Sequence, residues 1–288
     1  MFSVLSAVLE PFLLIALGYA LRGTKRFGAK ELWDGVEKLV FWVLFPPLLF
    51  NSVAHAKLTG LDTAEFLLFG TLAMATGVFM AKAVSKMAPA DPMTDASVRQ
   101  TGYRFNSYIC FALALNMYGQ EALALVALLT GIWVPISNAI AVADLSTLAG
   151  LFANILSHLT GFQVPNFITK IFSSLGSASM ATALLAIGAG LAVEDFARYK
   201  KLIALSTIQR LIVLPAVALA VAVATGLADT QTAALMCYAV VPTANSCYIM
   251  AARMGGNGPV VSDLTSVEVL VSLATIPMWC MALQAFVF

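Results

Sequence analysis

Long apolar runs follow one another along nearly the whole chain, and only short polar stretches separate them. Of the 288 residues, 60% are hydrophobic and 11% are charged, and the mean hydropathy is +0.90. A soluble domain carries about 25% charged residues, so these charges are too few to cover the surface of a soluble globule. The chain is therefore expected to be an integral membrane protein, with the lipid bilayer as its surroundings.

The apolar runs are long enough to cross a membrane as helices, each of which needs about 20 mostly apolar residues. They are continuous rather than alternating, which favours helices over the strands of a membrane barrel. We therefore predict an all-α fold of ten transmembrane helices. The predicted spans are residues 2–21, 36–54, 64–81, 103–118, 121–143, 146–164, 168–193, 203–226, 232–252 and 260–286.

The positions of the lysines and arginines predict how the chain is oriented. Such residues accumulate in cytoplasmic loops. The odd-numbered loops of the ten-span scheme hold most of them, namely Arg22, Lys25, Arg26, Lys30, Lys82, Lys86, Arg99, Arg104, Arg198, Lys200, Lys201 and Arg253. The opposite side holds only Lys57 and Lys170. Both termini are thus expected to face away from the cytoplasm, in the cytoplasmic (inner) membrane. Since no cation precedes the first run and several follow it, we expect a span there rather than a cleaved signal peptide.

Several classes of function are excluded by composition and by missing motifs. With 16 basic and 15 acidic residues the formal net charge is +1, which argues against nucleic-acid binding. Two histidines, His55 and His158, and four scattered cysteines make a metal or haem cofactor improbable. The sequence contains no GxSxG, HExxH, P-loop or GxGxxG motif. We therefore expect neither an enzyme nor an ATP-driven pump, and no cofactor other than a coupling ion, H⁺ or Na⁺.

Polar residues at membrane depth point to a binding site in span nine. Pro242 must kink or unwind this helix, and Thr243, Asn245 and Ser246 follow it within one turn. Carriers break helices near the middle of the membrane to expose backbone groups to a solute. We predict a substrate site here; the alternative is a proline kink whose freed groups bond to neighbouring hydroxyls.

Span four is the second polar helix, with Asn106, Ser107 and Asn116 as further candidate substrate-binding residues. The spacing from Asn106 to Gly119 equals that from Pro242 to Gly255. Spans four and nine are each fourth in a block of five. The chain therefore divides into two five-helix repeats, residues 1–145 and 146–288, and an odd number of helices makes the repeat inverted.

Three segments, Pro11–Tyr19, Leu39–Phe50 and Val241–Ser246, resemble the auxin efflux carrier family, which includes the plant PIN proteins and bacterial organic-acid carriers. The resemblance implies a bacterial-type member. It also implies a fold of the sodium/proton-antiporter or bile-acid-symporter type, in which broken helices four and nine cross at the substrate site. A transport domain (spans 3–5 and 8–10) would move like an elevator against a scaffold (spans 1, 2, 6 and 7). A homodimer is among the assemblies compatible with such a carrier.

The sequence departs from that family in two places. The proline that usually follows the asparagine of span four is missing after Asn106, so we expect helix four to break less sharply than helix nine. Plant members place an acidic residue and a lysine in span three, whereas this span offers Thr71, Thr76 and Lys82. Proton coupling through span three is therefore not expected.

Two other carboxylates are candidates for proton coupling, Glu268 in span ten and Glu10 in span one. A carboxylate at membrane depth either pairs with a cation or holds a proton. Packing-level hydrogen bonds or contact with lipid headgroups are the alternatives. Arg210 in span eight is either the partner of such a carboxylate or a structural residue that binds neighbouring carbonyls.

Asn51 and Asn154 in the scaffold spans are predicted to face the substrate across the domain boundary, with ordinary interhelical hydrogen bonds as the alternative. The sequence as a whole predicts a secondary transporter of a small organic anion, such as an auxin-like acid or malonate. A cation/proton antiporter on a similar scaffold is the second hypothesis. A membrane enzyme or sensor without transport is the third and has no supporting motif.

Overall fold

The computed structural model describes residues 2–54, 60–137, 165–191, 196–244, 247–248, 251 and 256–286, and within them every regular element is a helix. The helices are α1 (Phe2–Arg22), α2 (Lys30–Leu39), α3 (Phe45–Ala54), α4 (Gly60–Met87), α5 (Pro92–Arg99), α6 (Ser107–Ser137), α8 (Asn166–Gly190), α9 (Phe196–Ile208), α10 (Leu214–Thr225), α11 (Asp229–Val240) and α13 (Gly258–Phe286). Three short helical turns lie between them. Two are π-helical, η1 (Val40–Leu44) and η3 (Gln209–Val213), and one is a 3-10 turn, η2 (Gln100–Gly102). The predicted all-α fold is confirmed for the described part of the chain.

Five helical stretches in the described residues are long and apolar enough to cross a membrane: Asp62–Met87, Pro92–Trp133, Asn166–Gly190, Phe196–Thr225 and Gly258–Gln284. The chain is therefore a multi-pass membrane protein. The predicted span 146–164 lies outside the described residues, so the number of ten spans stays a prediction. Spans four and five, predicted as separate helices, follow one another within α6, where Gly119 interrupts the helix with a φ of 78°.

The stretch between spans three and four differs from the prediction. Residues expected in a loop form α5 and η2, and Arg104, expected among the loop cations, is buried at 6% exposure. The helix α5 is polar by sequence, and its buried face is held by Asn257, which donates from its side chain to Thr94 Oγ1 at 2.9 Å and from its backbone to Ser97 Oγ at 3.0 Å. Hydropathy misses such a segment because its polar groups are satisfied by partners distant in sequence.

Proline positions explain the two π-helical turns. The turn η1 precedes Pro46 and η3 precedes Pro215, and each joins two helical segments into one bent helix. Proline cannot donate to the carbonyl four residues before it, which favours a wider turn at that point. The freed carbonyl of Leu211, four residues before Pro215, accepts a hydrogen bond from the Trp279 indole N–H at 2.9 Å.

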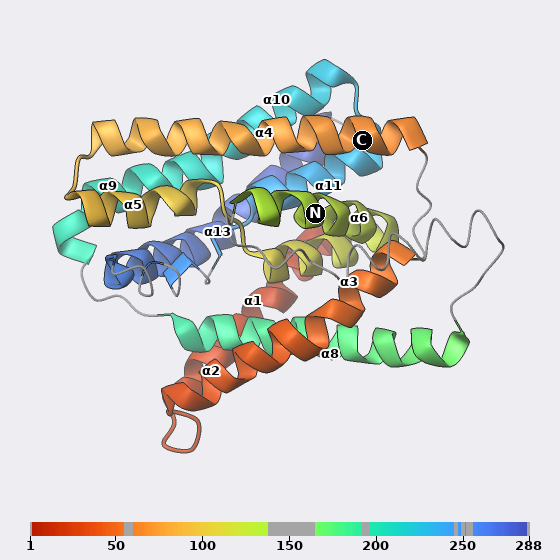
Figure 1. Ribbon diagram of the computed structural model, residues 1–288, viewed down its shortest axis with the longest axis horizontal. Coiled ribbons are helices and arrows are strands. Elements are labelled where there is room, and N and C mark those ends of the chain that lie inside the picture. The colour runs from red at the N-terminus through yellow and green to blue at the C-terminus, as the bar shows by residue number, and fades with distance from the viewer. Residues whose placement is uncertain are drawn as a thin grey trace.

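The helices form two groups. Figure 1 shows α2, α3 and α8 along one side of the molecule and α4, α9 and α10 along the opposite side. We call α1, α2, η1, α3 and α8 the α1/α8 group, because α8 contacts each of the others in it. The remaining helices, α4, α5, α6, α9, α10, α11 and α13, form the crossover group. Contacts of α1 with α6 and α13, and of α3 with α6, join the two groups.

The α1/α8 pair packs with its backbones in contact. A Cβ atom added at Gly188 would lie 1.8 Å from the Ile15 carbonyl oxygen, and one added at Gly18 would lie 2.0 Å from the Leu185 carbonyl oxygen. Only glycine permits this approach, and small residues are the usual means by which membrane helices pack closely. The two glycines thus fix the distance between the first helix and α8.

We predict that Gly188→Ala lowers stability by about 1–3 kcal/mol, the usual cost of overpacking a close interface. The melting temperature of the detergent-purified protein measures this change. Gly35→Ala in α2 is the matched control, because a Cβ at Gly35 meets nothing within 4 Å. Equal melting temperatures of the two variants would contradict the proposed close packing.

Candidate functional site

Two extended segments interrupt helices and meet in the centre of the crossover group. Residues 103–106 separate η2 from α6, and residues 241–244 follow α11. The Asn106 backbone N–H donates to the Pro242 carbonyl oxygen at 2.8 Å, and the rings of Phe105 and Tyr238 lie with their centroids 3.7 Å apart. Asn106 is 2% exposed and Thr243 is fully buried. We call these two segments the crossover.

Helix four breaks at the crossover although it lacks the proline expected there. The side chain of Asn106 accepts a hydrogen bond from the Ile109 N–H at 3.2 Å, so this asparagine caps the start of α6. Before the break, Gly102 packs so closely that an added Cβ would lie 2.7 Å from Gln209 Oε1 and 2.8 Å from the Ala81 Cβ. An asparagine cap and a close glycine contact therefore make the break that proline makes in helix nine.

Arg210 satisfies the end of α11 that Pro242 leaves without a donor. Its guanidinium donates to the Ala239 carbonyl at 2.9 Å and to the Tyr238 carbonyl at 3.4 Å, and the side chain is fully buried. Tyr238 is the residue four before Pro242, whose carbonyl would otherwise lose its partner. A cation also interacts favourably with the negative end of a helix. The structural role expected for Arg210, binding neighbouring carbonyls, is confirmed.

Glu268 satisfies the other side of the same break. It is fully buried on α13, and its Oε2 accepts a hydrogen bond from the Thr243 backbone N–H at 2.8 Å. Its Oε1 has no hydrogen-bond partner among the described residues. The Arg210 guanidinium thus bonds the chain before Pro242, and the Glu268 carboxylate bonds the chain after it. The second oxygen of Glu268 has no partner among the described residues.

Gln209 donates a hydrogen bond to the end of the first broken helix, just as Arg210 does to the end of the second. Its side-chain amide donates to the Gly102 carbonyl at 3.1 Å, at the end of η2. The two neighbouring residues of η3 therefore hold the ends of both broken helices. Sequence reasoning missed Gln209; the available signal was a pair of adjacent polar residues inside the apolar run 203–226.

The other predicted site residues lie apart from the crossover or at its edge. Ser107 is the first residue of α6 and is half-buried. Asn116 lies roughly 14 Å further along this helix, is exposed, and donates from its side chain to Glu10 at 3.4 Å. Asn51 is half-buried on α3. Three predicted residues lie outside the described part of the chain: Asn154, Asn245 and Ser246.

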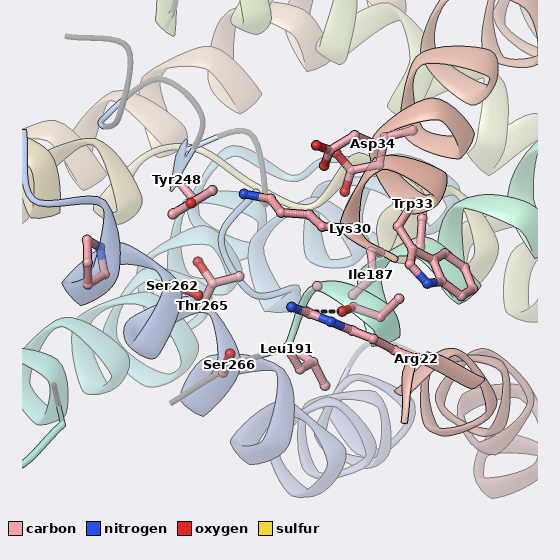
Figure 2. A pocket seen from close by; sticks show the side chains of 15 residues that line it. Arg22, Lys30, Trp33, Asp34, Ile187, Leu191, Tyr248, Ser262, Thr265 and Ser266 are labelled. Atoms are coloured by element: carbon pink, nitrogen blue, oxygen red, sulfur yellow. Dashed lines mark hydrogen bonds between the residues drawn. The ribbon is translucent and has the colours of Figure 1, made fainter. Parts of the chain in front are cut away.

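A cavity of about 290 Å³ lies between the two helix groups (Figure 2). Arg22, Lys30 and Trp33 line it from the α1/α8 group, and Ser262 and Ser266 line it from α13. None of these residues was predicted as a site residue. The usable signal was the helical spacing of Ser262, Thr265 and Ser266, which places three hydroxyls on one face of the last span.

Sequence comparison finds a family match in the second half of the chain. Residues 142–280 match the family model described as membrane transport protein, the auxin efflux carrier domain. This part of the chain is similar to the auxin efflux carrier family, in agreement with the resemblance noted in the sequence. No curated protein matches the chain. The matched residues include Arg210, Pro242 and Glu268, so one of the two crossover segments, residues 241–244, lies within the match. The family is one of membrane transporters rather than enzymes, as expected from the sequence.

We predict that Arg210→Met destabilises this auxin efflux carrier domain by about 3 kcal/mol, because it leaves carbonyls at the end of α11 without donors and Glu268 without its opposing charge. Thermal unfolding in detergent measures the loss. Arg198→Met, the same substitution at an exposed position of α9, serves as the control and should melt like the wild type. The assignment fails if the two variants have the same melting temperature.

Proposed function

We propose that the protein is a secondary active transporter that carries a small organic anion, such as an auxin-like acid or malonate, across the cytoplasmic membrane. The crossover is the observation that carries this proposal. Two extended segments meet there inside the helix bundle, joined by the hydrogen bond from Asn106 to Pro242. Interrupted helices with unwound backbone are the structures that membrane carriers use to bind solutes.

The charges at the crossover favour an anion as the solute. The first turn of α6 begins at the crossover, and a helix start carries a partial positive charge. The opposite, negative end of α11 is already occupied by Arg210. Asn106 and Thr243 would hold the carboxylate, together with Asn245, Ser246 and Ser107. Amide and hydroxyl groups of this kind suit any small carboxylate.

An elevator-type movement fits the division into two helix groups. The α1/α8 group contains the residues of predicted scaffold spans 1, 2 and 7, and the crossover group contains residues of predicted transport spans 3–5 and 8–10, which supports this proposal. The cavity lies between the groups, so relative movement would open and close it. This proposal includes the inverted repeat of residues 1–145 and 146–288 and termini on the extracytoplasmic side.

A cation/proton antiporter is the second candidate, and Glu268 is the observation that favours it. This buried carboxylate lies beside the broken helix and keeps one oxygen without a partner among the described residues. Transport assays with and without an organic anion decide between the two candidates.

Pro242→Ala is predicted to reduce transport at least about tenfold. Alanine restores the amide donor that proline lacks, so α11 can continue through the break and close the binding segment. Uptake of radiolabelled carboxylates, including malonate and indole-3-acetate, into proteoliposomes measures the flux. Pro277→Ala, a proline inside the continuous helix α13, is the control and should change the flux less than twofold.

Two results would argue against the proposed function. One is full carboxylate flux in Pro242→Ala. The other is Na⁺- or pH-driven cation exchange that requires no organic anion, which would favour the antiporter.

Glu268→Gln tests proton coupling through the carboxylate at the break. Glutamine keeps the size and an oxygen that accepts from the Thr243 N–H, but it cannot release a proton. We expect the variant to lose accumulation driven by a pH gradient and to keep exchange of labelled for unlabelled substrate. Glu10→Gln is the comparison, because Glu10 is exposed and contacts Asn116 rather than the crossover. An unchanged pH dependence of flux in Glu268→Gln would exclude Glu268 as the coupling group.

A further inference from the structure

The cavity between the helix groups has walls of different chemistry. The wall from the α1/α8 group carries the cations Arg22 and Lys30, and the wall from α13 carries the hydroxyls of Ser262, Thr265 and Ser266. In Figure 2 the Lys30 amine extends toward Tyr248, and the Arg22 guanidinium lies beside Leu191. Each group of helices thus supplies one half of the lining.

Both cations keep donors that no described residue uses. Lys30 places its amine 5.7 Å from the centre of the Tyr248 ring, and Arg22 donates one hydrogen bond to the Ala189 carbonyl. Neither forms an ion pair among the described residues. A guanidinium has five N–H donors and an ammonium has three. The cavity therefore offers several charge-assisted donors to a ligand.

The start of α13 adds to this positive character. The helix begins at Gly258, and the Asn257 side chain accepts from the Val260 N–H at 3.3 Å. Pro259 and Ser262, both in the first turns, line the cavity. The partial positive charge of a helix start attracts anions within its first turn. The cations and the helix start together favour a negatively charged group at this place.

The acidic residues of the lining limit how much negative charge it accepts. Asp34 and Glu37 of α2 also line the cavity, so the formal side-chain charges of its described lining residues sum to zero. One bound negative charge is offset by the start of α13, whereas a second would face these two carboxylates. This charge balance favours a monoanion over a dianion.

A polar stripe on α13 leads from the cavity to the crossover. Thr265 and Ser266 line the cavity, while Glu268, one turn beyond Thr265, bonds the Thr243 N–H. All three are buried, with exposures of 6%, 3% and 0%. Polar groups therefore continue from the cavity wall to the broken helix through an otherwise apolar interior.

We propose that the cavity is a second anion-binding site, which takes a monocarboxylate on the order of ten non-hydrogen atoms, held by Lys30 and Arg22 against the hydroxyls of α13. The size follows from the volume of about 290 Å³, since a water molecule in the liquid occupies about 30 Å³. Because its walls come from both helix groups, a bound anion holds the groups in the arrangement seen here. The inference deepens the proposed transport function by assigning an access site to its substrate.

Titration of the detergent-purified protein with benzoate, phthalate and benzamide tests this site, with Trp33 fluorescence as the readout. These probes share a ring and differ in charge. We expect saturable quenching by benzoate and at least about tenfold weaker binding of phthalate and of uncharged benzamide. Trp33→Phe should abolish the benzoate-dependent signal, because Trp33 lines the cavity.

Lys30→Gln is expected to weaken benzoate binding about tenfold or more, the effect of losing a hydrogen bond to a charged group. Lys38→Gln, at an exposed lysine of the same helix that does not line the cavity, should bind like the wild type. Equal affinities of the two variants, or benzamide and phthalate binding as tightly as benzoate, would overturn the proposal.

Asn106→Ala separates this proposal from the transport function. We expect it to stop carboxylate flux in proteoliposomes and to leave the quenching of Trp33 by benzoate unchanged. If no carboxylate is transported but Lys30-dependent binding persists, the transport proposal fails and the cavity site stands. If flux is normal but quenching does not depend on Lys30, the cavity site fails alone.

Discussion

A helix broken inside a membrane leaves backbone amides and carbonyls that water cannot reach, and each must find a partner within the protein. This constraint explains most of the buried polar residues near the crossover. Arg210 donates to the end of α11, Gln209 donates to the end of η2, and Glu268 accepts from the amide after Pro242. The wide turn η3 carries the first two of these residues side by side, so one irregular turn supports both breaks.

For the proposed transporter, the satisfied groups also limit where a solute could bind. Arg210 occupies the carbonyl end of α11. The groups that remain at the break are therefore a helix start and amide donors, and these favour an anion. Glu268 is the exception, since it adds a negative charge and keeps an oxygen without a partner among the described residues. Because Glu268 bonds the broken helix and can also take up a proton, it is a suitable residue to couple substrate binding to a proton gradient.

The division into two helix groups gives the cavity its composition. Gly18 and Gly188 hold α1 against α8 at backbone contact, which makes that pair a close-packed unit. The main buried cluster is centred on α6 and α11 and also includes residues of the α1/α8 group, such as Phe12, Phe45 and Leu184. The contacts between the two groups also include polar ones, such as those of Asn116 with Glu10 and of Lys30 with Tyr248. Charged and hydroxyl side chains therefore meet where the units face each other.

The sequence by itself determined the membrane setting, the helical class and the position of the break at Pro242, because hydropathy and proline chemistry act locally along the chain. It also singled out Asn106, Thr243, Glu268 and Arg210 as polar exceptions in apolar runs. Only the tertiary structure decided that α5 is a helix with one buried face, that helix four breaks at Asn106 without a proline, and that Gln209 bonds Gly102. It likewise placed Arg22 and Lys30 opposite the hydroxyls of α13. Those features depend on hydrogen bonds and contacts between residues far apart in the chain, and such partners leave no periodic trace in one sequence.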